Sequence, residues 1–447
     1  MQLRSDKLTG VAWDRVAGEP GSARVRRSHQ ISWAPSGWFV DVPLAGVSTD
    51  LLTLCCADEF FAVRVGFVNT HPEPYTVQRV IAAASSTVGD FVNPTGDAAW
   101  TTFTFAGGGR PSDRVVDAAG APTIVTVHGR SAQSDLDPGV AAWTWTDWAP
   151  IRSLERTDCP GAPPVLMLRV LFPAGTRSVR PNGSFAEYYL DAAANGGLTY
   201  VAGHAPRDAV TSTQQLSGAA CVLGNWFSPI ACVQFLTARA GVVCMTTGDS
   251  HHQGTGTATQ FGNYLLKAVA QLVPAVSGRM PIGYWSTARG GADSAYFFDA
   301  LASVLDVAQP GFVVLPGWSY NDTRNGVHDL ATADLFYARL LMAAELCWSR
   351  GARPVILTPF PRNRRSLGKT EMQAWLALRR RVVGLTSQGY AVVDAGGLLG
   401  RSSGGSYDGT YRPEFSDDGV HPNDAGHAAV AARLVPLLAE AAAAGPD

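Results

Sequence analysis

Hydrophobic positions change their period about halfway along the chain, and the change predicts two kinds of structure. In the first half, Val63, Val65 and Phe67 alternate with Ala62, Arg64 and Gly66, which is the two-residue period of a half-buried strand. Clusters of glycine, proline, asparagine and aspartate separate further short β-rich runs. These runs cover residues 101–105, 123–127 and 165–172. The pattern predicts an antiparallel, jelly-roll-like β-sandwich.

From about residue 240, short apolar segments alternate with longer stretches of helical period. The expected strands are residues 241–246, 311–315, 354–358 and 391–394. The expected helices are residues 294–308, 331–350 and 370–385, followed by a last helix that Asn423 caps. This alternation predicts a parallel sheet with helices on both faces. We therefore expect an all-β domain over residues 1–235 and a three-layer α/β domain over residues 236–447.

Composition narrows the classes of function. The chain has 447 residues and a net charge of −2, so it lacks the basic excess that a nucleic-acid partner requires. It has no apolar run of about 18 residues, so no membrane span is expected. The first ten residues, MQLRSDKLTG, contain no apolar signal core, which favours the cytoplasm. If a signal peptide was trimmed from the chain, secretion is the alternative.

The cysteines indicate neither a disulfide framework nor a zinc site. There are seven, an odd number, and several lie in apolar runs, as expected of buried free thiols. No Cys-x-x-Cys pair occurs. We expect no metal and no cofactor, and the sequence leaves the oligomeric state open.

Two motifs follow expected strands or loops of the second half. Gly248-Asp249-Ser250 comes directly after the strand at 241–246, which would place the serine hydroxyl in a turn at the sheet edge. A serine needs an adjacent base to act as a nucleophile, and His421 can supply it. Asp418, three residues earlier, can hold the other imidazole nitrogen. Each motif alone also fits a plain turn or a helix-capping carboxylate.

Acyl transfer also needs hydrogen-bond donors aimed at the developing oxyanion. Gly290 and Gly291 precede a helix, and Asn321 follows the strand at 311–315. The backbone N–H groups of Ser250 and Gly291 and the Asn321 amide would suffice, although the sequence does not decide between Gly290 and Gly291. Taken singly, the glycines also fit a turn and the asparagine a loop cap.

The order Ser250, Gly291, Asn321, Asp418/His421 resembles the four blocks of the SGNH (GDSL-type) hydrolases. Residues 63–69 and 164–173 look like the β-domain that precedes the catalytic domain in one bacterial branch of that family. The chain departs from the family pattern where His251 replaces the usual leucine or isoleucine. It departs again where Asn321 stands two residues further from Gly317 than usual.

The resemblance implies a serine-dependent carboxylic ester hydrolase that works through an acyl-enzyme. Short acyl esters such as acetyl esters, including those of carbohydrates, are the expected substrates. A lipid esterase, an acyl-thioesterase and a catalytically silent binding protein on the same fold remain alternatives. Trp318, Tyr320 and His251 could contact the substrate, although the first two could instead pack under their loop. Metal binding by His251 and His252 would need further ligands, which the sequence does not supply.

Overall fold

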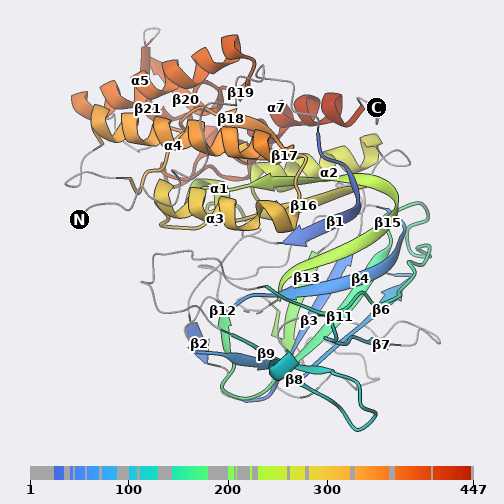
Figure 1. Cartoon of the computed structure of the whole chain (residues 1–447). Helices are drawn as coiled ribbons and strands as arrows, with labels where there is room; N and C mark the ends of the chain where they lie inside the picture. The colour runs from blue at the N-terminus through green and yellow to red at the C-terminus, as the bar shows by residue number, and fades with distance from the viewer. Residues whose placement is uncertain are drawn as a thin grey trace.

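The computed structural model describes most of the chain, with gaps. The described residues are 25–34, 41–43, 46–55, 58–69, 73–87, 100–107, 111–128, 143–179, 200–205, 208, 222–223, 230–258, 262–276, 281–322, 328–361, 368–403 and 406–443. They form a mixed α/β structure around a sheet that is mainly parallel (Figure 1).

The parallel part of this sheet has the strand order β16-β15-β17-β18-β19. These strands are β15 (Ile230–Thr246), β16 (Ile282–Ser286), β17 (Phe312–Leu315), β18 (Arg353–Leu357) and β19 (Ala391–Val393). Of these five strands β15 comes first in the chain, and β16 then pairs on one side of it and β17 on the other. Sheets of this order bind ligands at the carboxyl ends of the strands, where the order reverses. That point lies at the end of β15.

Helices cover both faces of the parallel strands, as the sequence predicted (Figure 1). One layer contains α2 (Tyr264–Val276), α6 (Ala395–Leu399) and α7 (Asp424–Ala443), and the other contains α3 (Ser294–Ala308), α4 (Leu330–Ser349) and α5 (Lys369–Gly384). Successive residues of a strand point to opposite faces. Val242 and Cys244 of β15 accordingly pack with the α2 layer, while Val243 and Met245 pack with the α3 layer.

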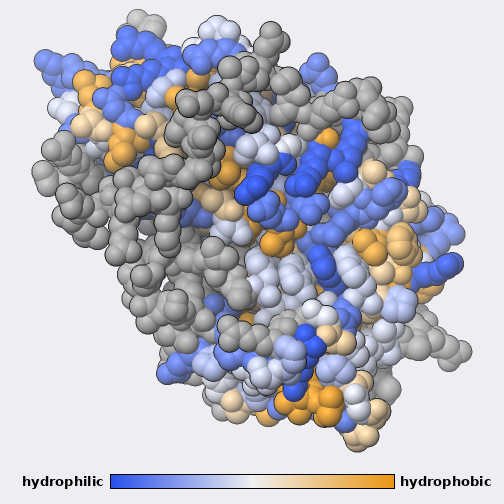
Figure 2. All heavy atoms as spheres, in the orientation of Figure 1, coloured by the Kyte–Doolittle hydropathy of each residue, from blue (hydrophilic) through white to orange (hydrophobic). Residues whose placement is uncertain are grey.

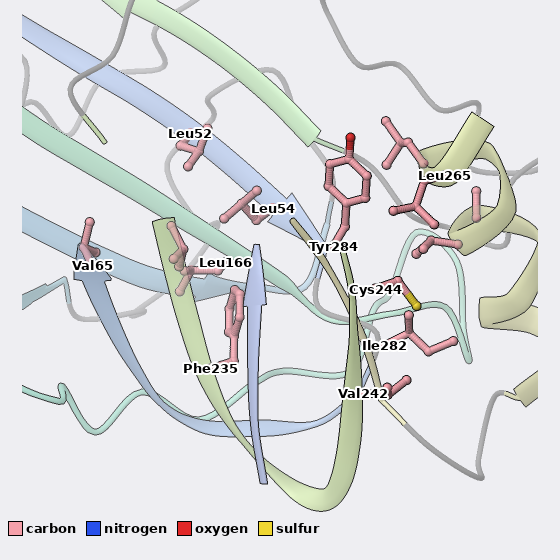
Figure 3. Packing of buried hydrophobic residues seen from close by; sticks show 14 of the residues in the cluster. Leu52, Leu54, Val65, Leu166, Phe235, Val242, Cys244, Leu265, Ile282 and Tyr284 are labelled. Atoms are coloured by element: carbon pink, nitrogen blue, oxygen red, sulfur yellow. The ribbon is translucent and has the colours of Figure 1, made fainter. Parts of the chain in front are cut away.

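Strand β15 is 17 residues long and takes part in both parallel and antiparallel pairing. Its second part pairs in parallel with β16 and β17, and its first part pairs antiparallel with β4 (Phe60–Phe67). Strand β1 (Ser28–Ala34) also pairs antiparallel with β15 and continues in parallel beside β16. Figure 3 shows Phe235 and Val242 on the two arms of the bent strand. The sheet therefore runs without a break from antiparallel to parallel pairing.

The remaining strands lie mostly in antiparallel sheets. A six-stranded sheet has the order β14-β13-β3-β11-β6-β7, a three-stranded sheet the order β5-β9-β8, and two further pairs are β2-β12 and β20-β21. Their bounds are β2 (Asp41–Pro43), β3 (Ser48–Cys55), β5 (Tyr75–Val77), β6 (Arg79–Ser85), β7 (Thr101–Thr102), β8 (Arg114–Val115), β9 (Ile124–Val127), β11 (Val165–Phe172), β12 (Arg177–Val179), β13 (Tyr200–Ala205), β14 (Val222–Leu223), β20 (Gly400–Ser403) and β21 (Ser406–Tyr411). The short elements β10 (Thr144–Trp145), η3 (Pro111–Asp113), η4 (Leu385–Gln388) and η5 (Pro413–Phe415) complete the set.

One hydrophobic cluster joins the antiparallel strands to the α/β layers. Leu54 and Leu166 from the six-stranded sheet, Phe235 from β15 and Leu265 from α2 belong to the same set of buried side chains (Figure 3). The expected strand at 101–105 is shorter than predicted, because only Thr101–Thr102 pairs. The phenylalanines after it, Phe103 and Phe105, are nevertheless buried in this cluster.

The expected boundary between residues 235 and 236 falls inside β15. Strands β1 and β4 precede that boundary yet belong to the sheet that carries the parallel strands. The division of the chain into 1–235 and 236–447 stays a prediction. Strand β1, helix α2 and strand β16 were not expected from the sequence.

The visible surface carries its hydrophobic residues in small separate groups (Figure 2). The most exposed large hydrophobic side chains include Val115 of β8 and its neighbour Val116, at 53% and 60%. Among the described residues, no helix combines the length and the apolar character that a membrane crossing demands.

The continuity of β15 predicts that residues 236–447 will not fold alone. A variant that begins at Leu236 lacks β1, β4 and the first arm of β15, so it exposes the edge of β16 and the apolar surface under Phe235. We expect this variant to be insoluble or to lack a cooperative thermal transition by circular dichroism. The full chain, prepared in parallel, is the control. A soluble fragment with a sharp transition would instead support the boundary at 235/236.

Candidate active site

The segment after β15 makes a tight turn that places Ser250 at the start of helix α1 (Ser250–Gln253). Gly248 has a φ of 137°, in the region that favours glycine. A Cβ atom on Gly248 would lie 2.4 Å from Cγ of His252. Asp249 caps the helix by accepting a hydrogen bond from the His251 N–H at 3.0 Å. The turn therefore requires glycine before the capping aspartate.

Ser250, His421 and Asp418 lie in a hydrogen-bonded row. His421 Nε2 is 3.0 Å from Ser250 Oγ, and His421 Nδ1 is 2.7 Å from Asp418 Oδ2. A carboxylate only accepts, so the proton of a neutral His421 sits on Nδ1 and leaves Nε2 free to accept from the serine hydroxyl. The structure thus brings together the three residues that the sequence suggested, in the order that nucleophile activation needs.

Asp418 also shapes the loop that carries His421. Its Oδ1 accepts the backbone N–H groups of Val420 and His421, each at 2.7 Å. Burial alone would raise the pKa of Asp418, but the hydrogen bonds from His421 and Val420 outweigh it and lower that pKa to about 2. Asp418 is therefore ionised throughout the neutral range. Gly256, with a φ of 96°, lets the chain after α1 approach Pro422 closely.

The pKa of His421 lies below its ordinary value. Burial is the main cause, and the neighbouring His251 lowers it further, while the bond to Asp418 works in the opposite direction. The neutral imidazole is thus favoured, and this is the form that can accept a proton.

The two glycines after β16 have different partners. The Gly290 N–H donates to Gln253 Oε1 at 2.7 Å, so it is already used. Gly291 has a φ of 78°, and a Cβ built on it would meet no heavy atom within 4 Å. No acceptor for its N–H is found among the described residues. Of the two, Gly291 is the one whose N–H is left for another acceptor.

Asn321 lies close to Gly291, because it is hydrogen-bonded to the next residue, Ala292. Asn321 Nδ2 donates to the carbonyl of Ala292 at 2.8 Å, which uses one of the two amide hydrogens. Asp322 fixes the same loop, because its Oδ1 accepts the Ser294 N–H at 3.0 Å. Burial raises the pKa of Asp322. The second amide hydrogen of Asn321 remains for another acceptor.

The two aromatic residues of this loop differ in exposure. Trp318 is only 3% exposed and stacks on Phe336 of α4. It therefore packs under the loop, which is one of the two interpretations that the sequence left open. Tyr320 is half-buried and bridges two loops, because its hydroxyl donates to the carbonyl of Phe360 and its N–H donates to Asp249 Oδ2. Its ring centroid lies 4.6 Å from that of His251.

Asp249 is the centre of a buried polar cluster that the sequence did not reveal. Besides the cap bond, its Oδ1 lies 3.2 Å from Nδ1 of His251 and 2.9 Å from Nδ1 of His252. Burial alone would raise the pKa of Asp249, but the charges and hydrogen bonds of the two histidines hold it well below its usual range. The signal was the unusual His-His pair, of which the sequence analysis suggested His251 for substrate contact.

Within the described part of the chain, no group of three or more His, Cys, Asp or Glu side chains is arranged to hold a metal ion. Cys159, Cys244 and Cys347 are free thiols, and the last two are buried.

Comparisons with known proteins find similar folds only among solved structures. No protein-family model and no curated protein matches the sequence. A GDSL-like lipase from Bacteroides thetaiotaomicron is 15% identical, with 44% of this chain and 88% of that one covered and a TM-score of 0.33. A family 3 carbohydrate esterase from Clostridium thermocellum is 15% identical, with coverage of 44% and 99% and a TM-score of 0.32. A variant of an acetyl xylan esterase from Geobacillus stearothermophilus is 16% identical, with coverage of 46% and 97% and a TM-score of 0.33. Over somewhat less than half of its length, the chain resembles solved structures of GDSL-type lipases and esterases.

The turn before Ser250 predicts a large difference between two glycine substitutions. Gly248→Ala combines a positive φ with a clash against the His252 ring, so we expect it to lower the free energy of unfolding by about 2–4 kcal/mol. Gly384→Ala is the control, because Gly384 lies at the end of α5 with helical φ and open space around it. That substitution should stabilise by about 0.5–1 kcal/mol. Urea unfolding of both variants measures the difference, and equal stabilities would contradict this view of the turn.

Proposed function

We propose that this protein is a serine-dependent carboxylic ester hydrolase of the SGNH (GDSL) type. The observation that carries the proposal is the hydrogen-bonded row in which His421 Nε2 lies 3.0 Å from Ser250 Oγ and His421 Nδ1 lies 2.7 Å from Asp418. A hydroxyl, an imidazole and a carboxylate in this order are equipped to form and hydrolyse an acyl-enzyme.

In the proposed reaction, Ser250 Oγ attacks the ester carbonyl carbon while its proton moves to His421 Nε2. Asp418 stabilises the imidazolium that forms. The C–O bond to the alcohol then breaks, and His421 returns the proton to the departing alkoxide oxygen. Water attacks the acyl-serine in the second half, again giving its proton to His421, and the acid leaves as Ser250 is restored.

The negative charge on the carbonyl oxygen needs donors that are already in place. We assign this role to the N–H groups of Ser250 and Gly291 and to the second amide hydrogen of Asn321. The Gly291 N–H has no acceptor among the described residues, and the bond from Asn321 to Ala292 fixes the Asn321 amide next to that glycine. Tyr320 and His251 border the same region, while the buried Trp318 would act only by supporting the loop.

The proposed substrates are esters of short acyl groups such as acetyl, including acetylated carbohydrates. The near-neutral net charge suits an uncharged ester. The antiparallel strands of the first half are proposed to form a jelly-roll-like β-sandwich, an architecture that often accompanies carbohydrate-active enzymes. This part of the proposal rests on analogy. The other candidates are a lipid esterase, an acyl-thioesterase and a binding protein without activity.

Replacing the nucleophile tests the core of the proposal. Ser250→Ala removes the attacking oxygen but keeps the turn. We therefore expect the rate of p-nitrophenyl acetate hydrolysis to fall by roughly 1,000-fold or more, as in other serine triads, with little change in thermal stability. A fluorophosphonate probe should label the wild type and not the variant. Activity of Ser250→Ala near that of the wild type would overturn the assignment, and a folded wild type that the probe does not label would favour the binding protein.

A series of esters tests the substrate class. Turnover of p-nitrophenyl esters should fall as the acyl chain grows from acetyl to longer chains, and acetylated sugars should release acetate. Thioesters of the same acyl groups serve as the comparison. A preference for long chains would favour the lipid esterase, and faster turnover of thioesters would favour the acyl-thioesterase.

A further inference from the structure

The proposed triad has a second imidazole packed against its base. His251 is the residue after the nucleophile, and its ring centroid lies 5.0 Å from that of His421. We propose that His251 is a positioning residue that keeps His421 in its neutral, proton-accepting form. This inference rests on the proposed function and deepens it, because it explains why a polar ring stands at this position.

His251 is held in place on several sides. Its side chain is buried, with only 1% of the residue exposed, and its Nδ1 lies 3.2 Å from the buried carboxylate of Asp249. Its ring lies 4.6 Å from Tyr320 and 6.1 Å from Phe360. Its Nε2 is buried and has no hydrogen-bond partner among the described residues. The ring therefore cannot turn away from His421 without losing its bond to Asp249.

The groups around His421 act in opposite directions on its protonation. Asp418 contacts its Nδ1 and Asp249 lies behind His251, and both carboxylates favour the charged imidazolium. The ring of His251 replaces water on one side of His421, and any positive charge that it carries repels a proton there. The balance favours the neutral form, since the pKa of His421 lies below its ordinary value with burial and His251 as the two lowering causes.

His252 provides an internal comparison. Its Nδ1 lies 2.9 Å from the same Asp249 oxygen, so it shares the hydrogen bond that fixes His251. Its ring, however, stacks on Phe360 with the centroids 5.2 Å apart and meets the edge of Tyr264, and among the described residues it makes no ring contact with His421. A change at His252 thus perturbs Asp249 without changing the neighbour of His421.

The test compares His251→Asn with His252→Asn. An asparagine amide can reach the place of Nδ1 and keep Asp249 partnered, but it cannot carry a charge or cover the His421 ring. The pKa of His421 is measured by NMR titration of its imidazole, with the resonance identified by its loss in His421→Gln, and again from the acidic limb of kcat/KM. We expect His251→Asn to raise this pKa by about half a pH unit or more. His252→Asn should leave it in place.

The proposal is wrong if the pKa of His421 stays unchanged in His251→Asn. It is also wrong if both variants shift this pKa equally, because the effect would then come from Asp249. His251→Phe is the second variant if the first does not fold, since it keeps a ring beside His421 but removes the ring nitrogens of His251, and it should shift the pKa of His421 in the same direction. The NMR titration needs no turnover. An inactive wild type would therefore count against the proposed function, while the titration would still decide the role of His251.

Discussion

The continuity of strand β15 is the constraint on which the rest of the structure depends. Its first arm pairs antiparallel with β4 and β1, and its second arm pairs in parallel with β16 and β17. The backbone hydrogen bonds of one strand thus fix the antiparallel and parallel parts of the sheet to each other. Ser250 stands four residues after the end of this strand, so the position of the proposed nucleophile depends on both kinds of pairing.

The two aspartates near Ser250 meet different electrostatic demands. The Asp418 side chain is 44% exposed and contacts one imidazole, so water shares in stabilising its charge. Asp249 is fully buried, and an isolated carboxylate there would be strongly disfavoured. Two imidazoles and the backbone N–H groups of His251 and Tyr320 take the place of water. The turn that presents Ser250 is therefore built around a buried charge, and its histidines are structural partners of that charge.

Local sequence patterns predicted many helices and strands, but they did not predict which distant strands pair with each other. The bounds expected for α3 and β11 match the structure, because each has a clear period and punctuating residues at its ends. Strand β1 alternates Ile31 and Trp33 with polar residues over only a few positions, and its partners Phe235 and Tyr284 lie about 200 residues or more away along the chain. The meeting of Ser250, Asp418 and His421 could be anticipated because a serine nucleophile needs a base and the order of these motifs resembles that of the SGNH hydrolases. The sequence left open whether Trp318 contacts substrate or packs under its loop, because its burial depends on Phe336 in a distant helix.

The choice between Gly290 and Gly291 as oxyanion donor depends on a contact that the sequence does not reveal. Two adjacent glycines in a turn are equivalent as a pattern, and a side chain on another element distinguishes them. Gln253 accepts the N–H of Gly290, whereas the N–H of Gly291 has no acceptor among the described residues. Since Gln253 lies in the same turn of helix as Ser250, helix α1 fixes the loop of the proposed oxyanion donor as well as the nucleophile. Attack and charge stabilisation would then share one rigid support, and a shift of α1 would disturb both together.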